Sequence, residues 1–236
     1  MTIALYVATF LGLLAAGRVV GRLAGLPQDR PSAWLRDAPI GLGAFAVQGV
    51  VYSLVGLPFS VWTVAAIWFP IAFWSERHRP AVRAKDRKTT VAELGIIVIG
   101  LGLALIAWSS PIHTSDAANI YGLNARVFAE SQGLDFKALR SLHFPGHIEY
   151  PPLLSLNLAL LFEIDGWAAT RLGLILLVLC WISLALHAFE IARHRIGWGV
   201  GLAATTILVL SPEVLNFARR AYGELPLAVY LSLIHI

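Results

Sequence analysis

Charged residues are scarce in this chain: Asp, Glu, Lys and Arg together make up 14% of its 236 residues. Soluble globular domains carry about a quarter charged residues, so this scarcity excludes an ordinary soluble fold. Hydrophobic residues account for 58% of the chain. Apolar runs of this abundance are typical of helices in a lipid bilayer, and the sequence therefore predicts an all-α, polytopic membrane helix bundle.

Cysteine is nearly absent as well, since Cys180 is the only one. A single cysteine excludes an internal disulfide framework and a metal site built from several thiolates. The net charge of +4 does not indicate nucleic acid as a partner, because the basic residues cluster beside apolar runs, where they orient membrane segments. No basic region precedes the first apolar run, so we expect no cleavable signal peptide.

Long apolar runs dominate the chain. We expect membrane spans at residues 2–26, 40–57, 59–74, 94–109, 168–191 and 198–212, and the start of another at Leu225. The run 151–164 is too short to cross about 30 Å of hydrocarbon, which takes about 20 residues. It also contains Asn157 and Glu163, so we expect a juxtamembrane or re-entrant helix on the outer side. The spacing of Gly17, Gly21 and Gly25 predicts close helix packing in the first span.

Basic residues orient these spans. The segment 75–93 holds the densest group: Arg77, Arg79, Arg83, Lys85, Arg87 and Lys88. The positive-inside rule places this segment in the cytoplasm, together with Arg193 to Arg195. Residues 110–150 then lie outside, where acidic residues balance the basic ones. Three tryptophans of the third span are expected at the interface or in packing: Trp62, Trp68 and Trp74.

The outer segment 110–150 carries the first candidate group. Thr114 and Ser115 precede Asp116, and Gly133 follows, a pattern that predicts a helix with an N-cap and a glycine stop. Asp116 then lies in the first turn, where the helix dipole favours an ionised carboxylate. This carboxylate either only stabilises the helix start or acts as a base that orients an acceptor.

The second outer segment carries Arg219, Arg220 and Glu224. Two arginines outside run against the positive-inside tendency. They either bind a ligand phosphate, which guanidinium groups recognise well, or reach lipid phosphates at the membrane rim. The histidines of the first outer segment have a spacing that matches no metal motif and are expected to be solvated or hydrogen-bonded: His113, His143 and His147.

The order of these residues carries a resemblance. It rests on Asp116, Tyr121, Ala125 and Gly133, then Tyr150-Pro151-Pro152-Leu153, and finally Gly223-Glu224-Leu225-Pro226-Leu227. This arrangement resembles the GT-C superfamily of membrane glycosyltransferases, in particular the protein O-mannosyltransferases and the lipid A aminoarabinose transferases. The resemblance covers roughly residues 94–227. It implies a GT-C-like bundle whose extracytoplasmic loop carries juxtamembrane helices, in a plasma membrane of bacterial type.

The resemblance implies a transferase that uses a polyprenyl-phosphate-linked sugar. Its expected partners are this lipid-linked donor, membrane lipids and an acceptor that the sequence does not identify. Asp116 and Glu224 are the implied catalytic residues. The implied substrate-binding residues are Arg219, Arg220, Tyr121, Tyr150 and His143. No cofactor is firmly implied, although a divalent cation stays open.

The chain also departs from the family pattern. Many relatives have Asp-Glu where this chain has Asp116-Ala117, which weakens the expectation of a paired-acid or metal-assisted site. Glu224 stands where aspartate is common, and three spans precede the usual first one. One alternative is a transporter or flippase of lipid-linked precursors, which needs charged or broken helices at mid-membrane, whereas these spans are nearly free of central charges. Another is a non-catalytic scaffold, which would not depend on Asp116.

Three regions follow from this interpretation. Residues 1–93 form the N-terminal spans and the basic cytoplasmic loop, and residues 94–230 form the GT-C-like catalytic region, which we expect to be incomplete. Residues 231–236, LSLIHI, match one reading frame of a transposon-end adapter used in sequencing-library preparation. We therefore expect them to be translated adapter and the natural protein to continue.

Overall fold

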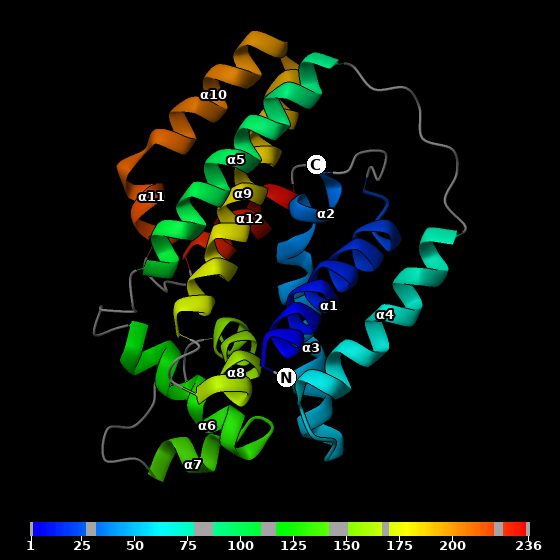
Figure 1. Ribbon diagram of the computed structural model, residues 1–236, viewed down its shortest axis with the longest axis vertical. Coiled ribbons are helices and arrows are strands. Elements are labelled where there is room, and N and C mark those ends of the chain that lie inside the picture. Colours follow the sequence, from blue (N-terminus) through cyan, green and yellow to red (C-terminus); the bar gives the residue numbers. More distant parts are fainter. Residues whose placement is uncertain are drawn as a thin grey trace.

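The fold is an assembly of helices, seen in a computed structural model (Figure 1). The structure describes residues 2–26, 32–77, 87–109, 117–141, 151–166, 170–219 and 224–234. Every regular element in these ranges is a helix. Four of the described helices are long and apolar enough to cross a membrane, and a bent pair raises the number to as many as five. The predicted all-α, multi-pass membrane bundle is confirmed at this level.

The long helices form two groups that meet at α9. One group contains α1 (Thr2–Leu23), α3 (Ala38–Val55) and α4 (Val61–Arg77), with the short α2 (Ala33–Arg36) leading into α3. The other contains α5 (Arg87–Ser109), α9 (Thr170–Arg195) and α10 (Trp198–Leu210). Because α9 contacts α5 and α10 as well as α2 and α3, it is the central helix of the bundle (Figure 1).

Shorter helices complete the structure. They are η1 (Ala117–Gly122), α6 (Leu123–Ser131), α7 (Phe136–Ser141), α8 (Leu153–Asp165), α11 (Pro212–Arg219) and α12 (Glu224–Ile234). The start of α5 and the end of α9 lie at the top of Figure 1, whereas α6 and α7 lie at the bottom. The start of α5 and the basic end of α9 therefore lie at the opposite end of the bundle from α6 and α7.

Four of the expected spans match helices that qualify as membrane spans, namely α1, α3, α5 and α9. The expected span 59–74 is α4, a helix of 17 residues that contains Pro70 and falls outside this group. The expected span 198–212 ends at Leu210, and α11 continues from it after a bend of 63°. The expected outer segment after this span begins with a helix that the sequence did not predict, in which Pro212 occupies the first position, where proline is tolerated.

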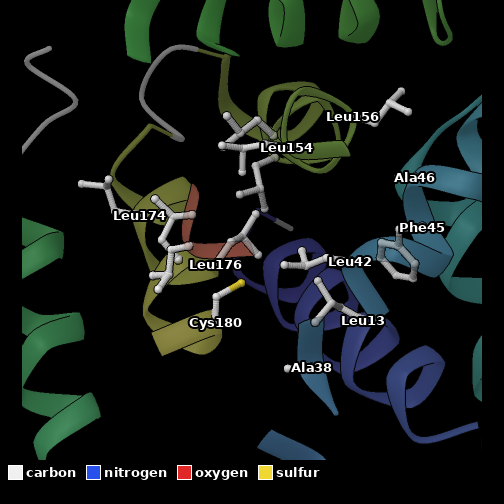
Figure 2. Close-up of a cluster of buried hydrophobic side chains, with 14 of the residues drawn as sticks. Leu13, Ala38, Leu42, Phe45, Ala46, Leu154, Leu156, Leu174, Leu176 and Cys180 are labelled. Atoms are coloured by element: carbon white, nitrogen blue, oxygen red, sulfur yellow. The ribbon is translucent and has the colours of Figure 1, made fainter. Parts of the chain in front are cut away.

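Helix α8 lies within the bundle. Its residues are apolar on all sides, which is typical of a helix surrounded by protein, and every residue from Leu154 to Phe162 is buried. At 13 residues it is about 20 Å long, shorter than the hydrocarbon layer. The expectation that this run is too short to span is confirmed, while its side of the membrane stays a prediction. Figure 2 shows side chains of α1, α3, α8 and α9 meeting in the core: Leu13, Leu42, Leu154, Leu176 and Cys180.

Helices α1 and α3 cross at two glycines. A Cβ added to Gly17 would lie 2.2 Å from the backbone oxygen of Asp37, and one added to Gly41 would lie 2.0 Å from that of Leu13. The prediction of close packing is therefore confirmed at Gly17. Gly25 instead follows the end of α1 with a left-handed φ of 75°.

Charged side chains are buried near the helix ends. Arg18 of α1 is 1% exposed, and its Nε donates to Oε1 of Glu76 at 2.9 Å. Arg36 pairs with the buried Asp37, also at 2.9 Å, and Glu93 of α5 is 4% exposed. These ion pairs were not predicted from the sequence, because hydropathy locates apolar runs and does not pair charges. They join residues at or near helix ends, whereas a transporter site needs charged or broken helices at mid-membrane.

We expect two engineered cysteines to report opposite sides of the membrane. In a Cys180→Ala background, Lys137→Cys places a thiol on the exposed surface of α7, and Arg195→Cys places one at the exposed end of α9. A membrane-impermeant thiol reagent should label Lys137→Cys in intact cells and Arg195→Cys only after permeabilisation. Labelling of both from the same side would refute the predicted orientation.

Candidate functional site

An apolar cavity lies where three segments far apart in the sequence meet. Its volume is about 270 Å³. The lining residues come from η1, the start of α8 and α12: Tyr121, Pro151, Leu153, Leu154, Pro226, Leu227 and Tyr230. The volume is near the lower end of the range of ligand sites, about 300–1,000 Å³. The cavity therefore suits a segment of an apolar ligand.

The first wall is Tyr121 in η1. This element is a π-helical segment of six residues that continues directly into α6. π-helical turns are rare and occur frequently at functional sites, so their position in a chain is informative. Tyr121 is 7% exposed, and Ala125 and Phe128 on the following α6 are buried with it in the core. The π-helical segment η1 thus places the side chain of Tyr121 at the cavity.

The second wall is the start of α8. Pro152 precedes its first residue, and the carbonyl of Pro152 accepts the first helical hydrogen bond, from the N–H of Leu156 at 2.8 Å. Proline suits this place because the first N–H groups of a helix have no intrahelical partner. The side-chain amide of Asn157 donates to the carbonyls of Leu153 and Leu42, at 2.7 and 3.0 Å. These bonds fix the first turn of α8 against α3.

The third wall is α12. Pro226 lies in its first turn, where a missing N–H costs no helical hydrogen bond. Leu225 and Val229 are buried, and α12 packs against α9 and α3. Tyr230 lines the cavity, and its hydroxyl donates to the backbone oxygen of Pro39 at 2.7 Å. Sequence reasoning missed Tyr230, although a tyrosine in an otherwise apolar run was the available signal.

The structure describes some of the predicted site residues and not others. Tyr121 lines the cavity. Arg219 is the last residue of α11 and Glu224 the first of α12, but their side chains lie outside the described part of the chain. Four others lie wholly outside the described residues: Asp116, His143, Tyr150 and Arg220. In the sequence, Asp116 immediately precedes η1 and Tyr150 immediately precedes Pro151.

A metal centre is not formed by the side chains that the structure describes. Within these ranges, no three His, Cys, Asp or Glu residues gather as a metal site requires. The carboxylates of Asp116 and Glu224 lie outside the described side chains, so a divalent cation at the candidate site stays open.

A polar cleft of about 380 Å³ lies between the α3–α4 and α6–α7 connections. The hydroxyl of Ser53 accepts a hydrogen bond from the N–H of Leu134 at 2.8 Å, and the carbonyl of Gln132 accepts one from the N–H of Phe59 at 2.7 Å. The predicted glycine stop is displaced by one residue, because Gln132 adopts the left-handed conformation, with φ 52°. Gly133 instead allows close approach, since an added Cβ would lie 2.9 Å from the hydroxyl oxygen of Ser53.

Glu163 joins the end of α8 to the start of α4. Its Oε2 accepts a hydrogen bond from the N–H of Val61 at 2.9 Å, which satisfies one of the free donors of the α4 N-terminus. Partial burial raises the pKa of Glu163, and the hydrogen bond from Val61 acts in the opposite direction. The sequence marked Glu163 only as a polar residue in a short apolar run, so this link was not predicted.

The sequence matches no protein-family model, and comparisons with curated proteins and with solved structures find no similar protein. The candidate site therefore rests on the residues and geometry of this chain.

Proposed function

We propose that the protein is a membrane glycosyltransferase that moves a sugar from a polyprenyl-phosphate-linked donor to an acceptor on the extracytoplasmic face. One observation carries the proposal. The apolar cavity is lined by residues from the same three segments on which the resemblance to the GT-C superfamily rests, around Tyr121, Pro151 and Pro226. In the sequence, two of these segments contain the candidate carboxylates of Asp116 and Glu224, and Arg219 and Arg220 shortly precede the third segment.

The donor has two chemical parts, and the site has a feature for each. The apolar lining suits the isoprenoid chain next to the phosphate, because burying apolar surface is favourable. The guanidinium groups of Arg219 and Arg220 would bind the phosphate and offset the charge that develops on it. Three further residues would contact the phosphosugar: Tyr121, Tyr150 and His143.

Transfer would proceed by attack of an acceptor hydroxyl on the anomeric carbon. A bond forms between the acceptor oxygen and this carbon, and the bond from the carbon to the phosphate oxygen breaks. The polyprenyl phosphate leaves with the electron pair of the broken bond. Asp116 would orient the hydroxyl and take its proton, and Glu224 would support the acceptor or the arginines.

We expect Arg219→Ala or Arg220→Ala to weaken use of the lipid-linked donor, because a fixed cation stabilises the departing phosphate. Loss of one such stabilising group typically lowers the rate by about 10²-fold. Lysine at the same position should restore only part of the activity, since it lacks the planar fork of arginine. The measurement is sugar transfer in membranes over a range of donor concentrations. Parental turnover by both alanine variants would rule out the phosphate role.

A transporter of lipid-linked precursors is the second candidate, and the bend between α10 and α11 favours it. The two helices meet at 63°, and broken helices are a common element of transporter sites. A fluorescent polyprenyl phosphate in sealed vesicles distinguishes the two functions. Protein-dependent movement of this lipid between leaflets, without sugar transfer, would favour the transporter.

A further inference from the structure

Tyr230 forms the side of the cavity that faces α3. Its hydroxyl donates to the carbonyl of Pro39 at 2.7 Å. The ring packs on Gly43, one turn further along α3: a Cβ added there would lie 3.1 Å from the hydroxyl oxygen and 3.6 Å from Cζ of Tyr230. The absence of a side chain at Gly43 therefore leaves room for the ring.

Two features fix the position of this ring. The hydrogen bond to Pro39 orients the hydroxyl, as a buried tyrosine normally requires. The backbone of α12 is fixed in turn by the burial of Leu225 and Val229, at 2% and 0% exposure. Because both the backbone and the hydroxyl of Tyr230 are fixed, its ring is a rigid boundary of the cavity. Ligands of different size therefore meet the ring at the same position.

We infer that Tyr230, seated on Gly43, is a specificity-determining residue that limits how far an isoprenoid chain extends into the cavity. The inference rests on the proposed function only in the identity of the ligand, a prenyl phosphate. The volume of about 270 Å³ supports it, because a cavity of this size holds only part of a polyprenyl chain. The position of its walls then sets how much of the chain can enter.

The two contacts predict substitutions with opposite effects. Tyr230→Ala removes the ring and extends the cavity toward Gly43, so a longer chain gains buried surface. Gly43→Ala leaves its Cβ 3.1 Å from the hydroxyl oxygen, a contact tight enough to displace the ring from α3. Displacement away from α3 narrows the cavity. Tyr230→Phe keeps the ring and loses only the hydrogen bond to Pro39, so it is the matched control.

The test measures binding of geranyl, farnesyl and geranylgeranyl phosphate to the full chain in detergent. For each ligand, the affinity of a variant is divided by that of the parent, which cancels partition of the ligand into micelles. With Tyr230→Ala this ratio should rise along the series, by about fourfold for each methylene that gains burial. With Gly43→Ala it should fall along the series, and with Tyr230→Phe it should stay flat. Tyr230→Leu replaces the alanine variant if that one does not fold.

Other outcomes would overturn the inference. A variant that is only less stable changes all three affinities by the same factor, so flat ratios for both Tyr230→Ala and Gly43→Ala would contradict a wall at Tyr230. If the parent protein binds none of the three ligands, the inference is contradicted as well. The assay involves no sugar transfer. If the variants change chain-length selectivity but the parent transfers no sugar, this inference holds and the transferase proposal is refuted. If the parent transfers sugar but the affinity ratios are flat, the transferase proposal holds and this inference is refuted.

Discussion

Replacing Asp116 with asparagine should lower sugar transfer by about 10²-fold or more while the protein still inserts and folds. Asparagine keeps the size of the side chain and caps a helix about as well as aspartate, but it lacks the charge. A carboxylate that only stabilises the helix start is therefore replaced at little cost, whereas a base is lost. The measurements are transfer by the protein in membranes, its expression level and its thermal stability.

Asp135 offers a matched control for this substitution. Its Oδ1 accepts a hydrogen bond from the N–H of Ala138 at 2.8 Å, so this carboxylate stabilises the start of α7. Asp135→Asn should fold and transfer sugar like the parent. If Asp116→Asn behaves in the same way, Asp116 is only a cap, and the transporter or scaffold interpretation takes its place.

Gly41→Ala should destabilise the bundle strongly. Its Cβ would lie 2.0 Å from the backbone oxygen of Leu13, so α1 and α3 have to move apart. Overpacking a core typically costs about 1–3 kcal/mol, and a clash with backbone falls at the upper end because no rotamer change relieves it. We expect a lower melting temperature in detergent and less folded protein in membranes.

Gly102→Ala is the control for this effect. Gly102 lies in α5, and nothing lies within 4 Å of a Cβ added there. Because alanine is favoured over glycine in a helix by about 0.5–1 kcal/mol, this variant should melt at or above the parental temperature. A Gly41→Ala protein that melts with the parent would refute the close crossing of α1 and α3.

The sequence predicted the elements that depend on local pattern. The apolar runs of α1, α3, α5 and α9 are long and continuous, so hydropathy alone located them. Helix α11 was missed because Pro212 was interpreted as a stop, whereas proline also suits the first position of a helix. The π-helical conformation of η1 has no sequence signature that we used.

Contacts between distant parts of the chain were beyond the reach of a single sequence. The bond from Tyr230 to Pro39 joins residues 191 positions apart, and that from Val61 to Glu163 joins residues 102 positions apart. No periodicity encodes such pairs. The residues quoted for the resemblance include Tyr121, Pro151 and Pro226, which line the cavity, but the sequence did not predict that they meet. The roles of Asp116 and Arg220, which lie outside the described residues, stay predictions.

The central position of α9 has a consequence for synthesis of the protein. The hydroxyl of Ser183 in α9 donates to the carbonyl of Arg36, which precedes it by 147 residues. At translation rates of about 5–20 residues per second, roughly 7–30 s pass before this partner leaves the ribosome. During that time the first helices are in the membrane without α9, which packs against α2 next to Asp37, a residue that is fully buried in the finished bundle. Nascent chains halted before residue 170 should therefore be the species that insertion chaperones and quality-control proteases engage.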